Sequence, residues 1–379
     1  MFRKVIVSTL AALCVSAPAP VLAQEEAGEA QTWSGYSLTS LGPPDRVEVS
    51  EEQGREVLTL TRTGVTLDGA EFSEGVIEFD VTFDSTMGFG GLLWHTNDRD
   101  AEYFYLRKHK SGMPDAGQYT PIRNGLTSWQ IYTDRDAIAP FAFTHEGWNR
   151  FKLVVEGDRA DIYFNGSEAP VLHIPDLATD RGSGGIGFRA SGPNGVIRIS
   201  NLSMRGLNAG EGVIGTPSGE RTAPPGVIAN WSVSAPFAEA LVDGQMTLPD
   251  GLPATGSLGM LAAETFGIAD ISRLAGPDDE LDTVLVSTRI TSNNARKVRM
   301  NFGYSDRVRL FLNGDLVFDG SAGWRRRDFF FLGTIGFEDA VVLDLEAGEN
   351  ELVAAVSETF GGWGFAGAIA DGEGLAIAP

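Results

Sequence analysis

Four side chains able to form hydrogen bonds alternate along one short stretch of the sequence. Tyr103, Tyr105, Arg107 and His109 occupy every second position. Successive side chains of a β-strand point to opposite faces, so we expect these four on one face of a sheet. Aromatic rings stack on the apolar CH faces of a sugar, and guanidinium and imidazole groups bind its hydroxyls. The pattern therefore predicts a face that could bind a carbohydrate.

The segment that follows, residues 112–132, extends this candidate face with a long loop and a run of amide and aromatic side chains. The complete set of predicted ligand-binding residues is Tyr103, Tyr105, Arg107, His109, Gln118, Tyr119, Asn124, Trp129 and Tyr132. The alternative is that the loop packs over the sheet and these polar groups satisfy one another. The sequence leaves both interpretations open.

A second candidate for chemistry is a pair of carboxylates, Glu78 and Asp80, which share a strand face about 7 Å apart. Retaining glycosidases place two carboxyl groups about 5 Å apart, and Thr82 stands where a third acid would extend the pair. A solvated strand face is the alternative. If the protein is an enzyme, His109 or Glu78 is the acid/base candidate and Arg107 would stabilise developing charge.

A turn at residues 95–100 gathers oxygen-bearing side chains, of which Asn97, Asp98 and Asp100 are candidate metal ligands. Ca²⁺ takes such ligands, so this cation is the one possible cofactor that we name. Asn and Asp also favour turns without any metal. No zinc, phosphate-loop or dinucleotide motif occurs in the sequence.

The elements that would position these residues are strands, because apolar residues recur with a period of two throughout the chain. We predict strands at residues 76–83, 151–155, 160–164, 185–189, 196–204, 283–290, 297–302, 308–312, 315–318, 341–345 and 351–356. Asn165-Gly166 and Asn313-Gly314 are hairpin signals, since both residues tolerate positive φ. A short helix is expected at most within residues 262–275. The pattern predicts an all-β protein of two antiparallel β-sandwich (jelly-roll) domains.

Residues 207–226 interrupt this pattern with many Gly and Pro residues, so we predict a linker between domains at 32–206 and 227–379. The N-terminus has the features of a signal peptide. Arg3 and Lys4 precede an apolar run at residues 5–15, and we expect cleavage after Ala23. Residues 24–31 are predicted to be disordered. The protein is thus expected to be periplasmic or secreted after export from a bacterial cytoplasm.

Charge and cysteine content restrict the function further. The net charge is −22, which disfavours nucleic acids and anionic membranes as partners. No segment after the leader is long and apolar enough to span a membrane. The single cysteine, Cys14, would leave with the leader, so the mature chain could form no disulfide and offer no thiolate.

The first half of the chain resembles the concanavalin A-like lectin/glucanase superfamily, in particular laminin-G-like and 3-keto-glycoside-hydrolase-like bacterial domains. The residues that carry this resemblance lie at 75–81, 90–94, 148–157, 162–166 and 184–188. The second half is similar to galactose-binding-like jelly rolls at residues 309–314 and 345–352. The resemblance implies a carbohydrate context and a glycan on the concave face of the first sandwich.

We therefore expect an exported carbohydrate-binding protein whose partner is a polysaccharide or oligosaccharide. A glycoside or 3-keto-glycoside hydrolase is the alternative, and a structural or adhesive protein is a second one. In the second half, Gly361–Phe365 and Trp324–Arg327 combine aromatic residues with glycine or arginine. Either segment could contact a glycan or pack against the first domain.

Overall fold

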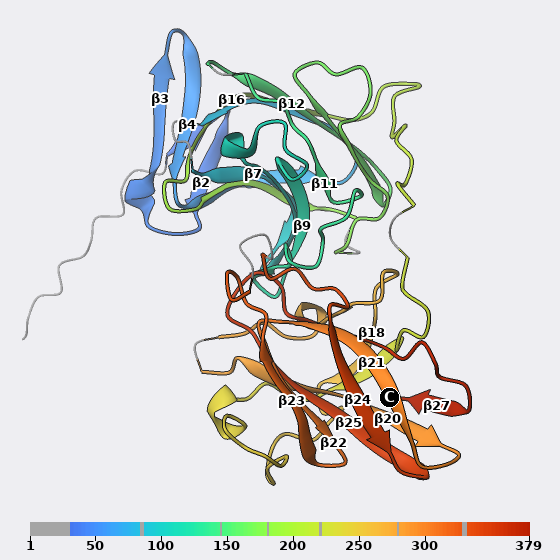
Figure 1. The fold of residues 1–379 in the computed structure, drawn as a ribbon. Helices are drawn as coiled ribbons and strands as arrows, with labels where there is room; N and C mark the ends of the chain where they lie inside the picture. The colour runs from blue at the N-terminus through green and yellow to red at the C-terminus, as the bar shows by residue number, and fades with distance from the viewer. Residues whose placement is uncertain are drawn as a thin grey trace, which may run out of the picture.

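The computed structural model describes residues 31–379 except 84–86, 145, 180–181, 220–221, 279 and 328–331. These residues form two β-sandwiches, as the sequence predicts, the first coloured blue to green and the second yellow to red (Figure 1). Helical structure in the described chain consists of short 3-10 turns at Pro44–Arg46, Lys108–Lys110, Glu239–Leu241 and Ile271–Arg273. No helix of this part of the chain is long and apolar enough to cross a membrane. The predicted signal peptide, Cys14 and most of the segment expected to be disordered lie outside the described residues.

One sheet of the first domain has nine strands and carries the predicted ligand-binding residues. Its order is β1 (Thr32–Trp33), β2 (Tyr36–Ser40), β5 (Gly64–Phe72), β15 (Gly184–Ser191), β7 (Phe89–Asn97), β8 (Asp100–Leu106), β9 (Gly117–Arg123) and β10 (Leu126–Thr127), with β11 (Ile138–Ala139) also paired to β9. Strand β9 lies toward the second domain (Figure 1).

The other sheet of the first domain has seven antiparallel strands. Its order is β14 (Leu172–Ile174), β13 (Arg159–Phe164), β12 (Asn149–Glu156), β6 (Gly75–Phe83), β16 (Val196–Arg205), β4 (Arg55–Thr61) and β3 (Val47–Glu52). In β6 the predicted alternation is present, because Phe79 and Val81 are buried while Glu78 and Asp80 are partly exposed. Phe79 stacks on Phe151 at 4.7 Å and meets Phe188 of the opposite sheet edge-on at 5.1 Å. The core of this domain therefore lies between its two sheets.

The second domain repeats the arrangement with a seven-stranded and a four-stranded sheet. The first has the order β18 (Gly259–Ala262), β17 (Asn230–Val233), β20 (Thr283–Ser292), β25 (Gly348–Ser357), β22 (Arg307–Leu312) and β23 (Asp315–Ser321), with β27 (Leu375–Ala378) paired to β20. The second has the order β19 (Ala269–Asp270), β26 (Gly364–Ala368), β21 (Arg296–Ser305) and β24 (Asp339–Leu345). Where a short helix was expected, the chain instead forms β19 and the 3-10 turn at Ile271–Arg273.

The predicted linker is held against the first domain over part of its length. It runs from the green to the yellow part of the chain (Figure 1). Oδ2 of the buried Asp161 accepts hydrogen bonds from the backbone N–H groups of Ile214 and Gly215 at 2.7 and 2.9 Å. The backbone N–H of Ser218 donates to Oδ1 of Asp136 at 2.7 Å. Buried carboxylates thus satisfy backbone groups that no strand partner takes.

The two domains contact each other through the segment that follows β9. The backbone N–H of Gln130 donates to Gly361 O at 2.8 Å, and its carbonyl accepts from the N–H of Ile335 at 2.9 Å. The side chain of Asn124 donates to Ser272 O at 2.8 Å. Part of the region expected to line a groove is therefore an interdomain contact.

Candidate functional site

The outer face of the nine-stranded sheet carries a small cluster that is separate from the core. Tyr103 and Tyr105 of β8 pack there with Leu93, Ala101 and Ile122, whereas Phe104 and Leu106 point into the core between the sheets. The two tyrosine rings lie 5.3 Å apart. The period-two pattern of the sequence thus places these tyrosines on one face, as expected.

The side chain of Gln118, on the neighbouring strand β9, organises this cluster. Its Oε1 accepts hydrogen bonds from Tyr105 Oη at 2.6 Å and from Arg107 Nη2 at 2.7 Å. Its Nε2 donates to the carbonyl oxygens of Trp129 and Tyr132 at 2.8 and 2.7 Å. Arg107 also donates to Tyr105 Oη at 2.5 Å, and its guanidinium lies 4.6 Å from the centre of that ring. One buried amide therefore connects strand β8, strand β9 and the loop beyond them.

The two tyrosine rings are nevertheless covered. Tyr103 and Tyr105 are only 2% and 4% exposed, so neither presents a ring face to a ligand. Burial raises the pKa of both hydroxyls above the ordinary value, and Arg107 partly opposes this effect. Among the residues that the structure describes, none is a hydrogen-bond partner of the Tyr103 hydroxyl. An open groove floored by these rings, as the sequence suggested, does not form.

Tyr119 and Tyr132 lie elsewhere, in the core between the sheets. The hydroxyl of Tyr119 donates to Glu102 Oε2 at 2.5 Å and accepts from the backbone N–H of Ala178 at 2.8 Å. Tyr132 packs edge-on against Phe266 of the second domain at 5.8 Å. The structure corrects the position expected for these two side chains, because the sequence pattern after the loop does not reveal whether they face the core, and a role of either in ligand binding stays a prediction.

Asn124 and Trp129 belong to the domain junction. Asn124 is half-buried and bonded to the second domain. The Trp129 ring is half-buried too, and it lies 6.4 Å from the ring of Phe360 in the second domain. Of the predicted ligand-binding residues, Trp129 thus combines a partly exposed aromatic ring with a direct link to the Gln118 network.

His109 and Arg107, two of the catalytic candidates, follow strand β8. His109 lies in the exposed 3-10 turn Lys108–Lys110, and partial burial together with Lys110 and Arg107 lowers the pKa of its imidazole. This favours the neutral form that could accept a proton. The guanidinium of Arg107 is committed to Tyr105, Gln118 and the carbonyl of Asp115, the last at 2.7 Å. The side chains of His109 and Arg107 therefore lie in different environments and do not form one catalytic group.

Glu78, the third catalytic candidate, lines a cavity of about 290 Å³ on the outer face of the seven-stranded sheet. Glu168 lines the same cavity and supplies a second carboxylate that the strand pattern did not contain. Arg150 pairs with Glu78 at 3.5 Å and with Asp80 at 3.3 Å. Asp80 also accepts from Arg55 at 2.6 Å, so it is part of an ion-pair network. The remaining lining residues are Lys152, Tyr163, Gly166 and Ser167.

The proposed metal-binding turn is joined to the rest of the protein by hydrogen bonds. Oδ1 of Asp100 accepts from the backbone N–H of Asn124 at 2.8 Å, and Arg99 donates to the Asn124 carbonyl at 2.5 Å. Within the described ranges, no three His, Cys, Asp or Glu side chains form a group that could hold a metal ion. Ca²⁺ binding at Asn97, Asp98 and Asp100 stays a prediction.

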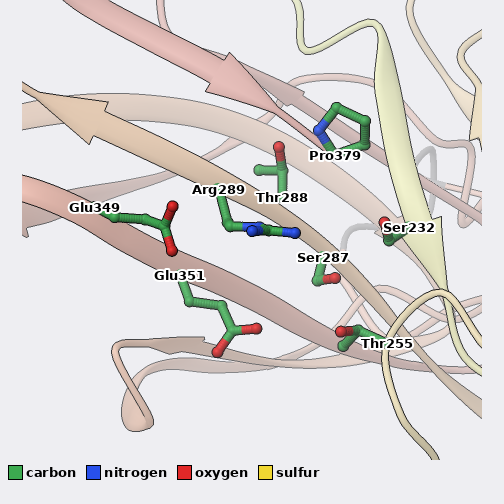
Figure 2. A pocket seen from close by; sticks show the side chains of 8 residues that line it. All are labelled: Ser232, Thr255, Ser287, Thr288, Arg289, Glu349, Glu351 and Pro379. Atoms are coloured by element: carbon green, nitrogen blue, oxygen red, sulfur yellow. The ribbon is translucent and has the colours of Figure 1, made fainter.

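A second cavity, of about 260 Å³, lies in the second domain (Figure 2). The side chain of Arg289 in β20 lies there beside hydroxyl side chains, and two glutamates come from β25 (Figure 2). The lining residues are Ser232, Thr255, Ser287, Thr288, Arg289, Glu349, Glu351 and Pro379. No aromatic ring lines this cavity, so it lacks a flat surface on which a sugar could stack.

Sequence reasoning missed Phe360 as a contributor to the surface around Trp129. Trp324 was named within the segment Trp324–Arg327, which was expected to contact a glycan or to pack against the first domain. Both are exposed aromatic residues beside glycine or arginine, which is the signal that could have identified them. The position of Phe360 next to Trp129 depends on the docking of the two domains, and Trp324 lies next to Phe360; neither contact is visible in the sequence.

Comparisons with known proteins add a likeness of fold. No protein-family model and no curated protein sequence matches the chain. A carbohydrate-binding module from Bacillus subtilis superposes at 14% identity and a TM-score of 0.33, over 44% of this chain and 92% of that one. A β-glucanase from Bacillus licheniformis superposes at 11% identity and a TM-score of 0.33, over 47% of this chain and 95% of that one. At these values the similarity says nothing about activity.

Proposed function

We propose that the protein is an exported carbohydrate-binding protein that contacts its glycan at the junction-side edge of the nine-stranded sheet. The observation that carries this proposal is the Gln118 network. A single buried amide bonds Tyr105 and Arg107 on one side and the backbone of Trp129 on the other. The half-buried indole of Trp129 is the stacking surface, and it replaces the covered rings of Tyr103 and Tyr105.

The physical reason is preorganisation. An indole whose backbone is held by a hydrogen bond from a buried amide loses little conformational freedom when a ligand binds. Aromatic stacking and hydrogen bonds from a neighbouring guanidinium are the contacts that a sugar ring needs. Arg107 is held in place by Asp115, Tyr105 and Gln118, and it helps to fix the amide that bonds the Trp129 backbone.

Binding of the mature protein to a glycan array, followed by calorimetry on the best ligand, tests this function. We expect Trp129→Ala to weaken binding at least tenfold, about 1.4 kcal/mol. Trp148→Ala is the matched control, because Trp148 lies by the other sheet, stacked against Arg55 and Arg198. If the wild type binds no glycan, or if Trp129→Ala binds as tightly as the control, the proposal is wrong.

Glycoside hydrolysis is a second candidate, favoured by the two carboxylates Glu78 and Glu168 in one cavity with Tyr163. A glycosidase needs one carboxyl group as acid and another as base or nucleophile. Incubation with glycosides and 3-keto-glycosides, followed by mass spectrometry, should then give product that Glu78→Gln does not form. Absence of product from the wild type, with and without divalent metal, would exclude this candidate.

Export is part of the proposal and has its own test. Expression of the full sequence in a bacterium, followed by N-terminal sequencing of the periplasmic and secreted fractions, should yield protein that begins at Gln24. Full-length protein retained in the cytoplasm would contradict it.

A further inference from the structure

Three aromatic rings follow one another across the domain junction. The Trp129 ring of the first domain lies 6.4 Å from Phe360, between centroids, with an interplanar angle of 41°. Phe360 lies 6.3 Å from Trp324, with an angle of 77°. Phe360 comes from the loop after β25, and Trp324 comes from the loop after β23. We call Trp129, Phe360 and Trp324 the junction row.

The junction row is accessible to a ligand. Phe360 is 46% exposed and Trp324 is 44% exposed. By contrast, four of the seven tryptophans of the chain are buried in its cores, namely Trp33, Trp94, Trp231 and Trp363. Large aromatic side chains that gather on a surface and remain exposed mark interaction sites, because burying them would stabilise the fold. A flat ligand that covers these rings would recover that free energy.

The loop that carries Phe360 is fixed in place by the first domain. Gly361 adopts a φ of 111°, and a Cβ at this position would lie 2.4 Å from Oε1 of Gln130. Only glycine permits so close an approach with this backbone conformation. The Gly361 carbonyl accepts the Gln130 N–H, and the hydroxyl of Ser305 donates to Gln130 Oε1 at 3.0 Å. The surface therefore exists before any ligand arrives.

Positive charge lies beside the last ring of the row. The guanidinium of Arg325 is 4.2 Å from the centre of the Trp324 ring, and Arg326 follows in the same exposed turn. Arg327 anchors this turn through Asp339 and the hydroxyl of Tyr304. Since Arg327 is paired with Asp339, Arg325 and Arg326 are the residues of this run that make it a local electropositive feature in a chain with a net charge of −22. Guanidinium groups bind carboxylates in preference to neutral hydroxyls.

From this arrangement we propose that the second domain completes the carbohydrate site and selects an acidic polysaccharide. The junction row would contact successive sugar rings, and Arg326 would bind the carboxylates of a uronic-acid chain. The inference rests on the proposed function, because it extends the surface that begins at Trp129. The inference goes beyond the proposed function because it gives the second domain a role in binding and specifies the charge of the ligand.

Calorimetry of the full-length mature protein with polygalacturonate and with a neutral β-glucan tests this inference. We expect tighter binding of polygalacturonate, weakening as salt is raised. Phe360→Ala and Trp324→Ala should each reduce its affinity at least tenfold. Phe360→Leu retains apolar contact without a ring and should also bind weakly, which separates stacking from misfolding. Arg326→Glu should reduce polygalacturonate binding at least fivefold, whereas Arg299→Glu, an exposed arginine of β21, should not.

The outcomes separate the two levels of the proposal. Wild type that binds no glycan would overturn the proposed function and this inference together. Loss of binding by Trp129→Ala, with wild-type binding by Phe360→Ala and Trp324→Ala, would overturn only the role of the second domain. Equal affinity for the neutral and acidic polymers, independent of salt and of Arg326→Glu, would overturn the acidic selectivity.

Discussion

Nη1 of Arg123 in the first domain lies 2.8 Å from Oδ2 of Asp270 in the second, and both side chains are buried. Glu264 adds a second carboxylate oxygen 3.3 Å from the same nitrogen. Asp270 is held in turn by the N–H of Ser272 at 3.0 Å. The ion pair thus joins the end of β9 to the turn that follows β19, and it fixes the domain junction near Trp129.

We expect Asp270→Ala to destabilise the protein by about 3–5 kcal/mol, because it leaves a buried guanidinium without its main partner. The measurement is urea unfolding followed by tryptophan fluorescence. Lys297→Ala is the control, since Lys297 and Asp344 form an ion pair at 3.0 Å with both side chains 70% exposed. Such exposed pairs contribute about 0–1 kcal/mol. Equal losses in the two variants would contradict the role given to the buried pair.

Gln118→Leu should destabilise the first domain and loosen Trp129. The substitution leaves Tyr105 Oη without its acceptor and the Tyr132 carbonyl without its side-chain donor, each in a buried setting, and it also removes the donor to the Trp129 carbonyl. Unsatisfied buried polar groups cost about 1–3 kcal/mol each. Thermal unfolding should show the loss of stability. The fluorescence emission of Trp129, taken as the difference between a protein and its Trp129→Phe variant, should shift when Gln118 is replaced. An unchanged unfolding temperature would be inconsistent with this network.

Asp161→Ala should release part of the interdomain segment. The carboxylate of Asp161 accepts the N–H groups of Ile214 and Gly215 through Oδ2 and contacts Nδ1 of His173 at 2.8 Å through Oδ1. Hydrogen exchange at Ile214 and Gly215 should become at least tenfold faster, because both amides lose their acceptor. Exchange at Ser218, whose N–H donates to Asp136, serves as the internal reference. Unchanged exchange at Ile214 and Gly215 would refute this assignment.

The buried Glu358 should make stability dependent on pH. Burial, and then the neighbouring Asp306, raise the pKa of its carboxyl to about 8. The unfolded chain loses this proton near its ordinary pKa while the folded protein retains it. Stability therefore falls by about 1.4 kcal/mol per pH unit as pH rises from about 4.5 toward 8, and this contribution becomes constant above 8.

Glu358→Gln removes this titration while conserving shape. The variant should unfold at a higher temperature than the wild type at pH 8, and the difference should shrink toward pH 5. Calorimetric unfolding across that range is the measurement. A difference between variant and wild type that is the same at both pH values would show that Glu358 is not the titrating group.

Local sequence patterns were sufficient to predict most of the strands. The alternation in β6 follows from its own residues, because a strand with one buried face must place apolar side chains at every second position. Asn313-Gly314 joins β22 and β23 directly, with φ values of 51° and 88°. Asn165-Gly166 has the same positive φ angles, but its partner strand β14 begins only at Leu172, since the next residues form a loop.

The candidate site was only partly predictable. The sequence placed Tyr103 and Tyr105 on one sheet face, but alternation is the same whether that face is open or covered. It could not assign Tyr119 and Tyr132 to the core, since the side of Tyr119 depends on the register of β9 with its neighbours and Tyr132 lies in a loop outside the strands. The second carboxylate of the Glu78 cavity, Glu168, was also missed, because it reaches the cavity from a separate loop.

The sequence by itself thus determined the all-β class, the two sandwiches and the alternating face that carries Tyr103 and Tyr105. These features depend on side-chain polarity and turn preference, which act between residues close in the chain. Only the tertiary structure decided which rings remain exposed. The docking of Gly361 on Gln130 places Phe360 beside Trp129, and Trp324 lies beside Phe360. Contacts between such distant segments leave no periodic pattern in the sequence.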